Sequence, residues 1–426
     1  MNPRIKTFIK TFGPGVMFAG TCIGGSHLVQ STKAGAFYGF GLLVMVLLAN
    51  IFKYPFFEFA SRYTNATGDS ILEGYHRLGK WILGIYGLVT IVSMFIITAA
   101  IGTFTAGLAN NIFTSLLGEE LIPNKLWAVI MFMLVFSILA YGKFKILDLL
   151  LKIIGVVLVI TVITAFVSVF INSPLPQTKL SSFEILTSKA GLTFAVALMG
   201  WMPTAVDMSS WHSLWTQERI KQTGYHPTLK ETLLDFNIGY GITIVLAVLF
   251  LSIGAIVLYG HPVHTPEAIS KMGGLAYANT LVSMFTKAVG SWSYFIIAIA
   301  AFATMFGTSI TLIDGYCRSI KRTFILLKGK NPSEASTYSY LSWVAVLMFG
   351  ASLIIFFFVE NLGDIVNLAT IISFIIAPFA AILNFKIVLS KEVSHDKKPP
   401  LWLKVLAIAG IIFLSVFTII FLYYKF

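Results

Sequence analysis

Long apolar runs recur along the whole chain and constrain its fold more than any other feature of the sequence. A run of roughly 18 or more apolar residues is long enough to cross the hydrocarbon core of a bilayer as a helix. Of the 426 residues, 57% are hydrophobic and only 11% are charged, whereas about a quarter are charged in ordinary soluble domains. The runs do not alternate apolar and polar residues, as the strands of a membrane barrel do. The sequence therefore predicts an all-α, polytopic integral membrane protein embedded in the lipid bilayer.

The apolar runs predict about eleven transmembrane helices joined by short connections. The expected spans lie near residues 13–36, 39–60, 81–110, 126–141, 146–171, 191–214, 236–259, 289–313, 339–359, 364–388 and 402–423. No cleavable signal peptide is expected, because the first run lacks a small-residue cleavage site. Cys22 and Cys317 fall in predicted spans, so a disulfide framework is not expected. The longest outer loop contains His261 and His264, for which a solvated loop is favoured over a metal site.

Basic residues cluster on alternate connections, which predicts the orientation by the positive-inside rule. If the N-terminus is cytoplasmic, most Lys and Arg residues fall on the inner connections. The outer segments then carry only Lys125, Lys179, Lys189, Lys271, Lys287 and Lys425. We therefore expect a multi-pass protein of a bacterial plasma (inner) membrane, with the C-terminus outside. The net charge of +12 is read as this orientation signal, and no nucleic-acid partner is expected.

The first span is interrupted at its centre by Gly24, Gly25, Ser26 and His27. Glycine costs a helix about 1 kcal/mol relative to alanine, and unwound backbone at membrane depth is tolerated only against protein or a water-filled cavity. One interpretation is two half-helices that meet at mid-membrane and offer N–H and C=O groups to a solute. The alternative is a glycine-rich helix that packs closely against its neighbours. A second interrupted segment, at Gly200–Thr204, favours the first interpretation.

Interruptions at corresponding places in two halves are typical of inverted-repeat transporters, which bind their solute at the repeat interface. Spans one to five can be laid over spans six to ten, and each group begins with an interrupted span. The predicted architecture is a leucine-transporter-type fold with a 5+5 inverted repeat and broken helices 1 and 6. We expect residues 1–390 to form the transporter core, with repeats at about 1–172 and 190–390, and residues 391–426 to form a peripheral helix.

Two polar side chains next to the interruptions are the main functional candidates. A histidine at mid-membrane is costly unless it has a partner or a role, so His27 is interpreted as a solute contact or proton carrier. The alternative is a neutral histidine bonded to a nearby carbonyl. In the sixth span Pro203 frees a carbonyl near Met199, and Asp207 follows one turn later. Asp207 is expected to hold a cation or to pair with His27 or a lysine, the alternative being a structural ion pair.

Other charged residues in or beside spans are interpreted as structural. They are Lys53 and Glu58, the i,i+4 pair Asp148 and Lys152, and Asp314 with Arg318. The chain contains no GxxxxGK[ST] phosphate loop, no HExxH and no GxSxG motif. No enzyme activity and no cofactor are therefore expected, and energy for transport would come from an ion gradient or from the gradient of the solute.

Several motifs resemble those of Nramp (natural resistance-associated macrophage protein) divalent metal transporters. They are Gly13–Gly15, Ala34–Leu43, Leu47–Asn50, Ala66–Gly68, His212 and Ser213 with Gln217 and Arg219, and Ala377–Phe379. The likeness extends over spans one to ten. It implies a leucine-transporter-type fold and alternating access, usually with protons coupled to the inward flow of manganese or iron.

The departures from the family pattern fall at the substrate site. Where the family has Asp-Pro-Gly-Asn in the first break, Gly24 replaces the ligand aspartate and His27 replaces the ligand asparagine. The family's Met-Pro-His in span six has two possible registers here. By motif it corresponds to Met202–Thr204, and by counting back from His212 it corresponds to Ala205–Asp207. The family's glutamine in span ten falls on Thr370. Nramp-related magnesium transporters also lack part of the transition-metal ligand set.

The favoured hypothesis is an Nramp-like secondary transporter that moves a divalent metal cation. Its predicted substrate site comprises Gly24, Gly25, Ser26, His27, Met202, Thr204, Ala205, Asp207 and Thr370. His27 and Asp207 are the predicted metal ligands, and His212 with Asp207 the predicted proton route. The second hypothesis is the same fold carrying a non-metal solute, such as a small anion or zwitterion, because the ligand aspartate and asparagine are missing. The third is a non-transporting sensor or a passive channel.

Overall fold

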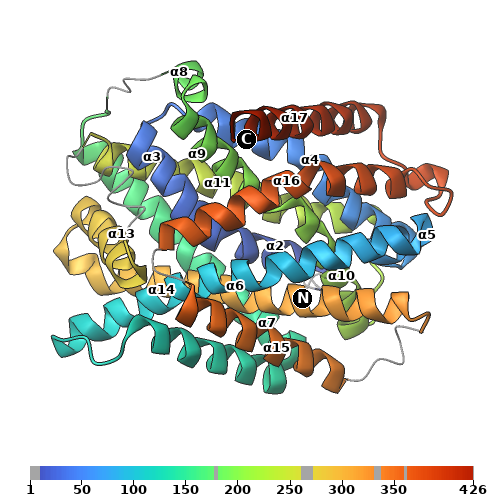
Figure 1. The fold of residues 1–426 in the computed structure, drawn as a ribbon, viewed down its shortest axis with the longest axis horizontal. Coiled ribbons are helices and arrows are strands. Elements are labelled where there is room, and N and C mark those ends of the chain that lie inside the picture. The colour runs from blue at the N-terminus through green and yellow to red at the C-terminus, as the bar shows by residue number, and fades with distance from the viewer. Residues whose placement is uncertain (1–9, 177–180, 261–271, 331–336, 359–361, 426) are drawn as a thin grey trace, which may run out of the picture.

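The computed structural model describes residues 10–425 apart from 177–180, 261–271, 331–336 and 359–361. Every regular element in this part of the chain is a helix, and Figure 1 shows the long helices side by side in one bundle. The predicted histidine pair of the outer loop, His261 and His264, lies outside the described residues. The same is true of the side chain of Asp148 and therefore of its expected pairing with Lys152.

The predicted spans are found at the expected places. Among the described residues, ten helices are long and apolar enough to cross a membrane. The first predicted span is divided among three shorter elements, α2 (Pro14–Cys22), the π-helix η1 (Ile23–Ser31) and α3 (Thr32–Tyr38), and adds the eleventh. The all-α polytopic fold is therefore confirmed.

The first half of the chain continues from this divided span into four more. They are carried by α4 (Leu43–Thr67), α6 (Lys80–Leu117) and the two spans of α7 (Asn124–Asn172), Asn124–Tyr141 and Leu151–Asn172. A short helix, α5 (Ile71–Leu78), precedes α6 and begins with a capping box in which Ser70 and Glu73 exchange hydrogen bonds. Such boxes satisfy the free N–H groups of a first helical turn.

Among the described residues, the second half contains a second divided span and five further spans. After the short helix α8 (Ser182–Thr187), the elements in order are α9 (Lys189–Trp201), the 3-10 turn η2 (Val206–Met208), α10 (Ser209–Thr223), α11 (Leu229–Leu258), α13 (Gly274–Val289), α14 (Tyr294–Leu327), α15 (Thr337–Phe357), α16 (Leu362–Val388) and α17 (Leu401–Lys425). The helix α13 lies in the expected outer loop. Figure 1 shows α17 along one edge of the bundle, where it packs against α4, α9 and α16.

Two glycines of the divided first span, Gly15 and Gly35, let its backbone approach that of α11 at two points. A Cβ atom at Gly15 would lie 2.1 Å from the Asp235 carbonyl oxygen, and one at Gly35 would lie 2.0 Å from the Leu251 carbonyl oxygen. Asp235 also accepts hydrogen bonds from the N–H groups of Gly13 (3.0 Å) and Gly15 (2.7 Å). Since small residues allow close backbone packing in membranes, α11 fixes both ends of the first span.

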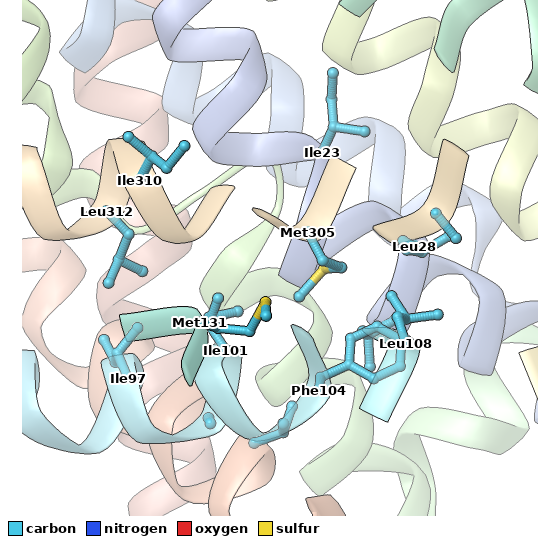
Figure 2. Packing of buried hydrophobic residues seen from close by; sticks show 14 of the residues in the cluster. Ile23, Leu28, Ile97, Ile101, Phe104, Leu108, Met131, Met305, Ile310 and Leu312 are labelled. Atoms are coloured by element: carbon cyan, nitrogen blue, oxygen red, sulfur yellow. The ribbon is translucent and has the colours of Figure 1, made fainter. Parts of the chain in front are cut away.

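Apolar side chains hold the middle of the first span against two long helices. Figure 2 shows Ile23 and Leu28 of η1 near Met305 of α14, with Ile101 and Phe104 of α6 beneath them. All five belong to one buried hydrophobic cluster. The interruption therefore sits in the interior of the bundle, with its apolar side packed against α6 and α14.

Candidate transport site

The first interruption is a π-helical stretch, not the unwound backbone that the sequence predicts. All nine residues of η1, from Ile23 to Ser31, are buried. At its end the N–H of Thr32 still bonds to the carbonyls of His27 and Val29. Backbone N–H and C=O groups without a hydrogen bond are costly at membrane depth. The wider turns of a π-helix keep these groups hydrogen-bonded within the segment, and such turns are frequent at functional sites.

The two glycines of η1 lie where a side chain would collide with neighbouring helices. A Cβ atom at Gly24 would lie 2.4 Å from Oγ1 of Thr308, and one at Gly25 would lie 2.7 Å from Cζ3 of Trp201. Thr308 belongs to α14 and Trp201 is the last residue of α9. Gly24 and Gly25 therefore act in this conformation as sites of close packing, which was the alternative interpretation of this segment.

The second interruption is unwound, as predicted. The helix α9 ends at Trp201, residues Met202–Ala205 are not helical, and the chain resumes in η2 and α10. The Met202–Pro203 peptide bond is cis. The side chains of Met202, Thr204 and Ala205 are buried, and the Thr204 hydroxyl donates to Sδ of Met208 at 2.8 Å. The carbonyls of Gly200, Pro203 and Thr204 at this point of the sixth span accept hydrogen bonds from side chains of other helical segments.

Ser26 connects the two interruptions directly. Its hydroxyl oxygen lies 2.8 Å from the carbonyl oxygen of Pro203, a residue 177 positions later in the chain. The same hydroxyl also contacts the carbonyl of Cys22 and lies 2.6 Å from Nδ1 of His27. A predicted site residue of the first half thus contacts the second interruption in the bundle interior.

His27 is fully buried, and both of its ring nitrogens are engaged by the protein. Nε2 lies 2.8 Å from the carbonyl oxygen of Thr243 on α11, and Nδ1 lies 3.0 Å from that of Cys22. A metal ligand needs a ring nitrogen with a free lone pair. In the neutral ring, the Nε2–H group donates to Thr243 and Nδ1 carries a lone pair. The single proton of the Ser26 hydroxyl serves either this lone pair or the Pro203 carbonyl, one at a time. His27 would have to exchange one of these bonds to reach an ion.

Asp207 lies beside the unwound segment, on η2, and its side chain is buried. The carboxylate is within electrostatic range of Lys53 and of the phenols of Tyr75, Tyr86 and Tyr316. Its own backbone carbonyl accepts from Ser210 at 2.9 Å. The sequence predicts that Asp207 pairs with His27 or with a lysine, and the structure places a lysine, Lys53, within electrostatic range of its carboxylate.

That lysine, Lys53, lies at the second interruption, a position that the sequence analysis did not predict. Its position on α4, five residues before Glu58, suggested a local structural role. Glu58 instead bonds to Arg62, whose Nε lies 3.0 Å and 3.1 Å from the two carboxylate oxygens. The Nζ atom of Lys53 lies 2.5 Å from the Met199 carbonyl oxygen, 2.9 Å from that of Gly200 and 3.1 Å from that of Thr204. Pro203 was the available signal, because it frees a carbonyl that needs a donor.

The remaining predicted residues flank the site. Thr370 of α16 is buried and its hydroxyl bonds within its own helix to Val366 and Asn367. Its carbonyl oxygen lies 2.1 Å from the position that a Cβ atom would take at Gly200. His212 of α10 is also buried; its Nδ1 lies 3.0 Å from Oγ of Ser61, and its Nε2 has no hydrogen-bond partner.

The donor set is poor for a transition metal in this conformation. The described residues contain no cluster of three or more His, Cys, Asp and Glu side chains of the kind that holds a metal ion. His27 and Asp207 thus remain a predicted pair of ligands. Asp314 forms the expected ion pair with Arg318, whose Nε lies 2.8 Å from its carboxylate.

Comparisons with known proteins give one consistent result. A family model described as natural resistance-associated macrophage protein-like matches residues 15–424. The uncharacterized protein PM0681 of Pasteurella multocida is 36% identical over 414 residues, covering 96% of this chain and 91% of that protein. The divalent metal cation transporter MntH of Staphylococcus aureus is 26% identical over 264 residues, covering 59% of this chain and 56% of MntH.

Solved structures share the fold. A crystal structure of a mutant manganese transporter of Eremococcus coleocola superposes with a TM-score of 0.75 at 15% sequence identity, covering 98% of this chain and 87% of that one. The same transporter bound to an aromatic bis-isothiourea compound superposes with a TM-score of 0.69 at 17% identity.

Proposed function

Because the chain belongs to the natural resistance-associated macrophage protein (Nramp) family, we propose that it is a secondary transporter that moves a divalent metal cation across the membrane by alternating access. The proposal places the cargo between η1 and the unwound segment Met202–Ala205. The curated Staphylococcus relatives are named as divalent metal cation transporters, which supports a metal as the cargo.

One observation carries the location of the site. The Ser26 hydroxyl bridges to the Pro203 carbonyl at 2.8 Å, so the interruptions of the first and sixth spans lie against each other in the bundle interior. Transporters of this architecture bind their solute between two such discontinuous helices, near the middle of the membrane. A movement of one half against the other would open this contact to either side.

Asp207 and His27 are the side chains that we propose as cation ligands, with backbone oxygens at Ile23 and Gly24. A cation that loses its hydration shell in a low-dielectric interior needs anionic or strong oxygen and nitrogen ligands. Asp207 supplies a carboxylate. His27 would supply a nitrogen after exchanging one of its present hydrogen bonds. His212, with a buried and unpartnered Nε2, lies one helix further along the same span and is proposed as part of a proton route with Asp207.

The surrounding organisation belongs to the same proposal. Residues 1–390 form the transport core of two inverted repeats, and residues 391–426 lie outside it. The protein would sit in a bacterial inner membrane with a cytoplasmic N-terminus, as the basic residues of the connections indicate.

Uptake by proteoliposomes tests the function. The wild-type protein should accumulate Mn²⁺ above the level of protein-free vesicles, and Asp207→Asn should lower the initial rate at least about tenfold because a lost anionic ligand costs more than the 1.4 kcal/mol that a factor of ten represents. Asp396→Asn, at an exposed residue of η5 (His395–Lys397), is the matched control and should behave like the wild type. Wild-type uptake of Mn²⁺ no faster than leakage into empty vesicles contradicts the proposal.

A second candidate cargo is a non-metal solute such as a small anion or zwitterion. It is favoured by Lys53, whose ammonium already bonds to the carbonyls that the second interruption frees, and by the absence of a carboxylate at Gly24. This candidate predicts that Mn²⁺ and Mg²⁺ neither shift the thermal unfolding of the protein nor compete with its cargo. Competition by either ion would exclude it.

A further inference from the structure

Lys53 is a fully buried lysine whose ammonium bonds to backbone oxygens. Two of its acceptors, Met199 and Gly200, lie in the last turn of α9, and the third, Thr204, lies inside the unwound segment. The last carbonyls of a helix carry the negative end of the helix dipole. The Met199 carbonyl also accepts from the N–H of Met202 at 3.3 Å, so Lys53 is its second donor. Three oxygens with partial negative charge therefore converge on one point in the bundle.

The ammonium matches these three oxygens in number. An ammonium has three N–H donors and no acceptor, so the carbonyls of Met199, Gly200 and Thr204 account for all of them. A charge buried away from water is tolerated only when it is paired and fully hydrogen-bonded. Asp207, which is within electrostatic range, contributes the opposing charge without displacing the carbonyls.

This arrangement differs from an ordinary buried ion pair. The nearest acidic residue along α4, Glu58, bonds to Arg62 instead. The lysine therefore reaches across from α4 to the sixth span, 146 residues away, in order to bond to backbone oxygen. A set of convergent backbone carbonyls is also how proteins bind dehydrated monovalent cations, since such oxygens replace the hydration shell of the ion.

We propose that the carbonyl groups of Met199, Gly200 and Thr204 form a monovalent-cation site that Lys53 fills with its own ammonium. The tethered cation stabilises the unwound segment and keeps free cations away from these oxygens. Lys53 thereby restricts the cargo to ligands on the side of Asp207 and His27. When the side chain is shortened, the oxygens bind a free ammonium, potassium or sodium ion in its place.

The test is the salt dependence of thermal unfolding of the purified, detergent-solubilised protein. Lys53→Ala is compared with the wild type in NH₄Cl, KCl, NaCl and choline chloride at one ionic strength, because choline is too large for the site. The variant should unfold at a lower temperature than the wild type in choline and regain a substantial part of the difference in at least one of the other salts. The wild type and Lys80→Ala, which removes an exposed lysine at the start of α6, should unfold at the same temperature in every salt.

Equal unfolding temperatures for Lys53→Ala in choline and in all three small cations would overturn the proposal, as would an equal gain for Lys80→Ala. If Lys53→Ala cannot be purified, Lys53→Gln is used, since its amide keeps N–H donors without a charge. If Lys53→Gln is as stable as the wild type in choline chloride, the three carbonyls need no cation, and the proposal is contradicted. A less stable Lys53→Gln protein that recovers in NH₄Cl supports the site, and one that does not recover contradicts it. These measurements involve neither metal nor transport, so they stand or fall independently of the proposed function.

Discussion

The interruptions of the first and sixth spans solve the same physical problem in different ways. In η1 the backbone stays helical through wide π turns, and its hydrogen bonds remain within the segment. In Met202–Ala205 the backbone is unwound, and a neighbouring helix supplies the missing donors through Lys53. Unpaired polar groups are costly in a membrane, so each interruption depends on the feature that keeps its backbone groups paired. The first depends on the close packing of its glycines, and the second depends on one buried charge.

The neighbours of the two interruptions also differ in how far they can yield. Gly24 and Gly25 face side-chain atoms of Thr308, Met305, Trp201 and Ile101. Gly200, at the end of α9, faces the backbone carbonyl of Thr370. Side chains can rotate away from an added methyl group, whereas two helical backbones must separate. Gly200 at the second interruption should therefore tolerate substitution less well than Gly24 and Gly25 at the first.

Gly200→Ala should have the largest effect. Its Cβ atom would lie 2.1 Å from the Thr370 carbonyl oxygen, which forces α9 from α16 and disturbs the carbonyls that Lys53 holds. We expect a loss of stability of about 3 kcal/mol, at the upper end of the usual cost of overpacking, and a loss of uptake. Thermal unfolding in detergent measures the first and proteoliposome uptake the second. The control is Gly84→Ala in α6, where no atom lies within 4 Å of the added Cβ; equal stability of the two variants would contradict this reading of α9 and α16.

Gly25→Ala should have a smaller effect on stability. The added Cβ would lie 2.7 Å from Trp201 and 2.8 Å from Ile101, and both side chains can shift, so we expect a cost of about 1–2 kcal/mol. The same thermal assay compares it with Gly200→Ala. If Gly25→Ala proves the more damaging of the two, the first interruption is the rigid one and the comparison is reversed.

Ser26→Ala should have the smallest effect on stability and a larger one on transport. It removes the hydroxyl that joins the interruptions, a hydrogen bond with a net value of about 1 kcal/mol. Ser26→Thr retains the hydroxyl and is the matched variant. We expect Ser26→Ala to change the initial rate of Mn²⁺ uptake more than Ser26→Thr does, while both unfold near the wild-type temperature. Identical uptake by the two variants would remove the Ser26–Pro203 contact from the transport step.

The spans and the second interruption could be predicted from the sequence because each depends on local information. Apolar runs of sufficient length specify membrane helices, and Pro203 marks the end of α9. The form of the first interruption could not be predicted, because a glycine pair is compatible with both an unwound turn and a closely packed helix. Gly24 and Gly25 are distinguished only by what lies opposite them, Thr308 and Trp201.

The partner of Lys53 was beyond sequence reasoning for a related reason. Spacing along α4 places Glu58 nearby, yet Glu58 is four residues from Arg62, and an i,i+4 pair is a good local alternative. Which acceptor Lys53 reaches depends on the packing of α4 against α9, elements far apart in the chain. The engagement of His27 by Thr243 is likewise a long-range contact, with α11.

The most direct test of the account is anomalous diffraction from crystals of the protein grown with Mn²⁺, recorded at the manganese absorption edge. We expect a peak between η1 and Met202–Ala205, next to Asp207, with the ammonium of Lys53 still bonded to the Met199 carbonyl. Two results would contradict it: a manganese peak at another place, or no peak in crystals grown at saturating Mn²⁺ from protein that transports Mn²⁺ when redissolved and reconstituted.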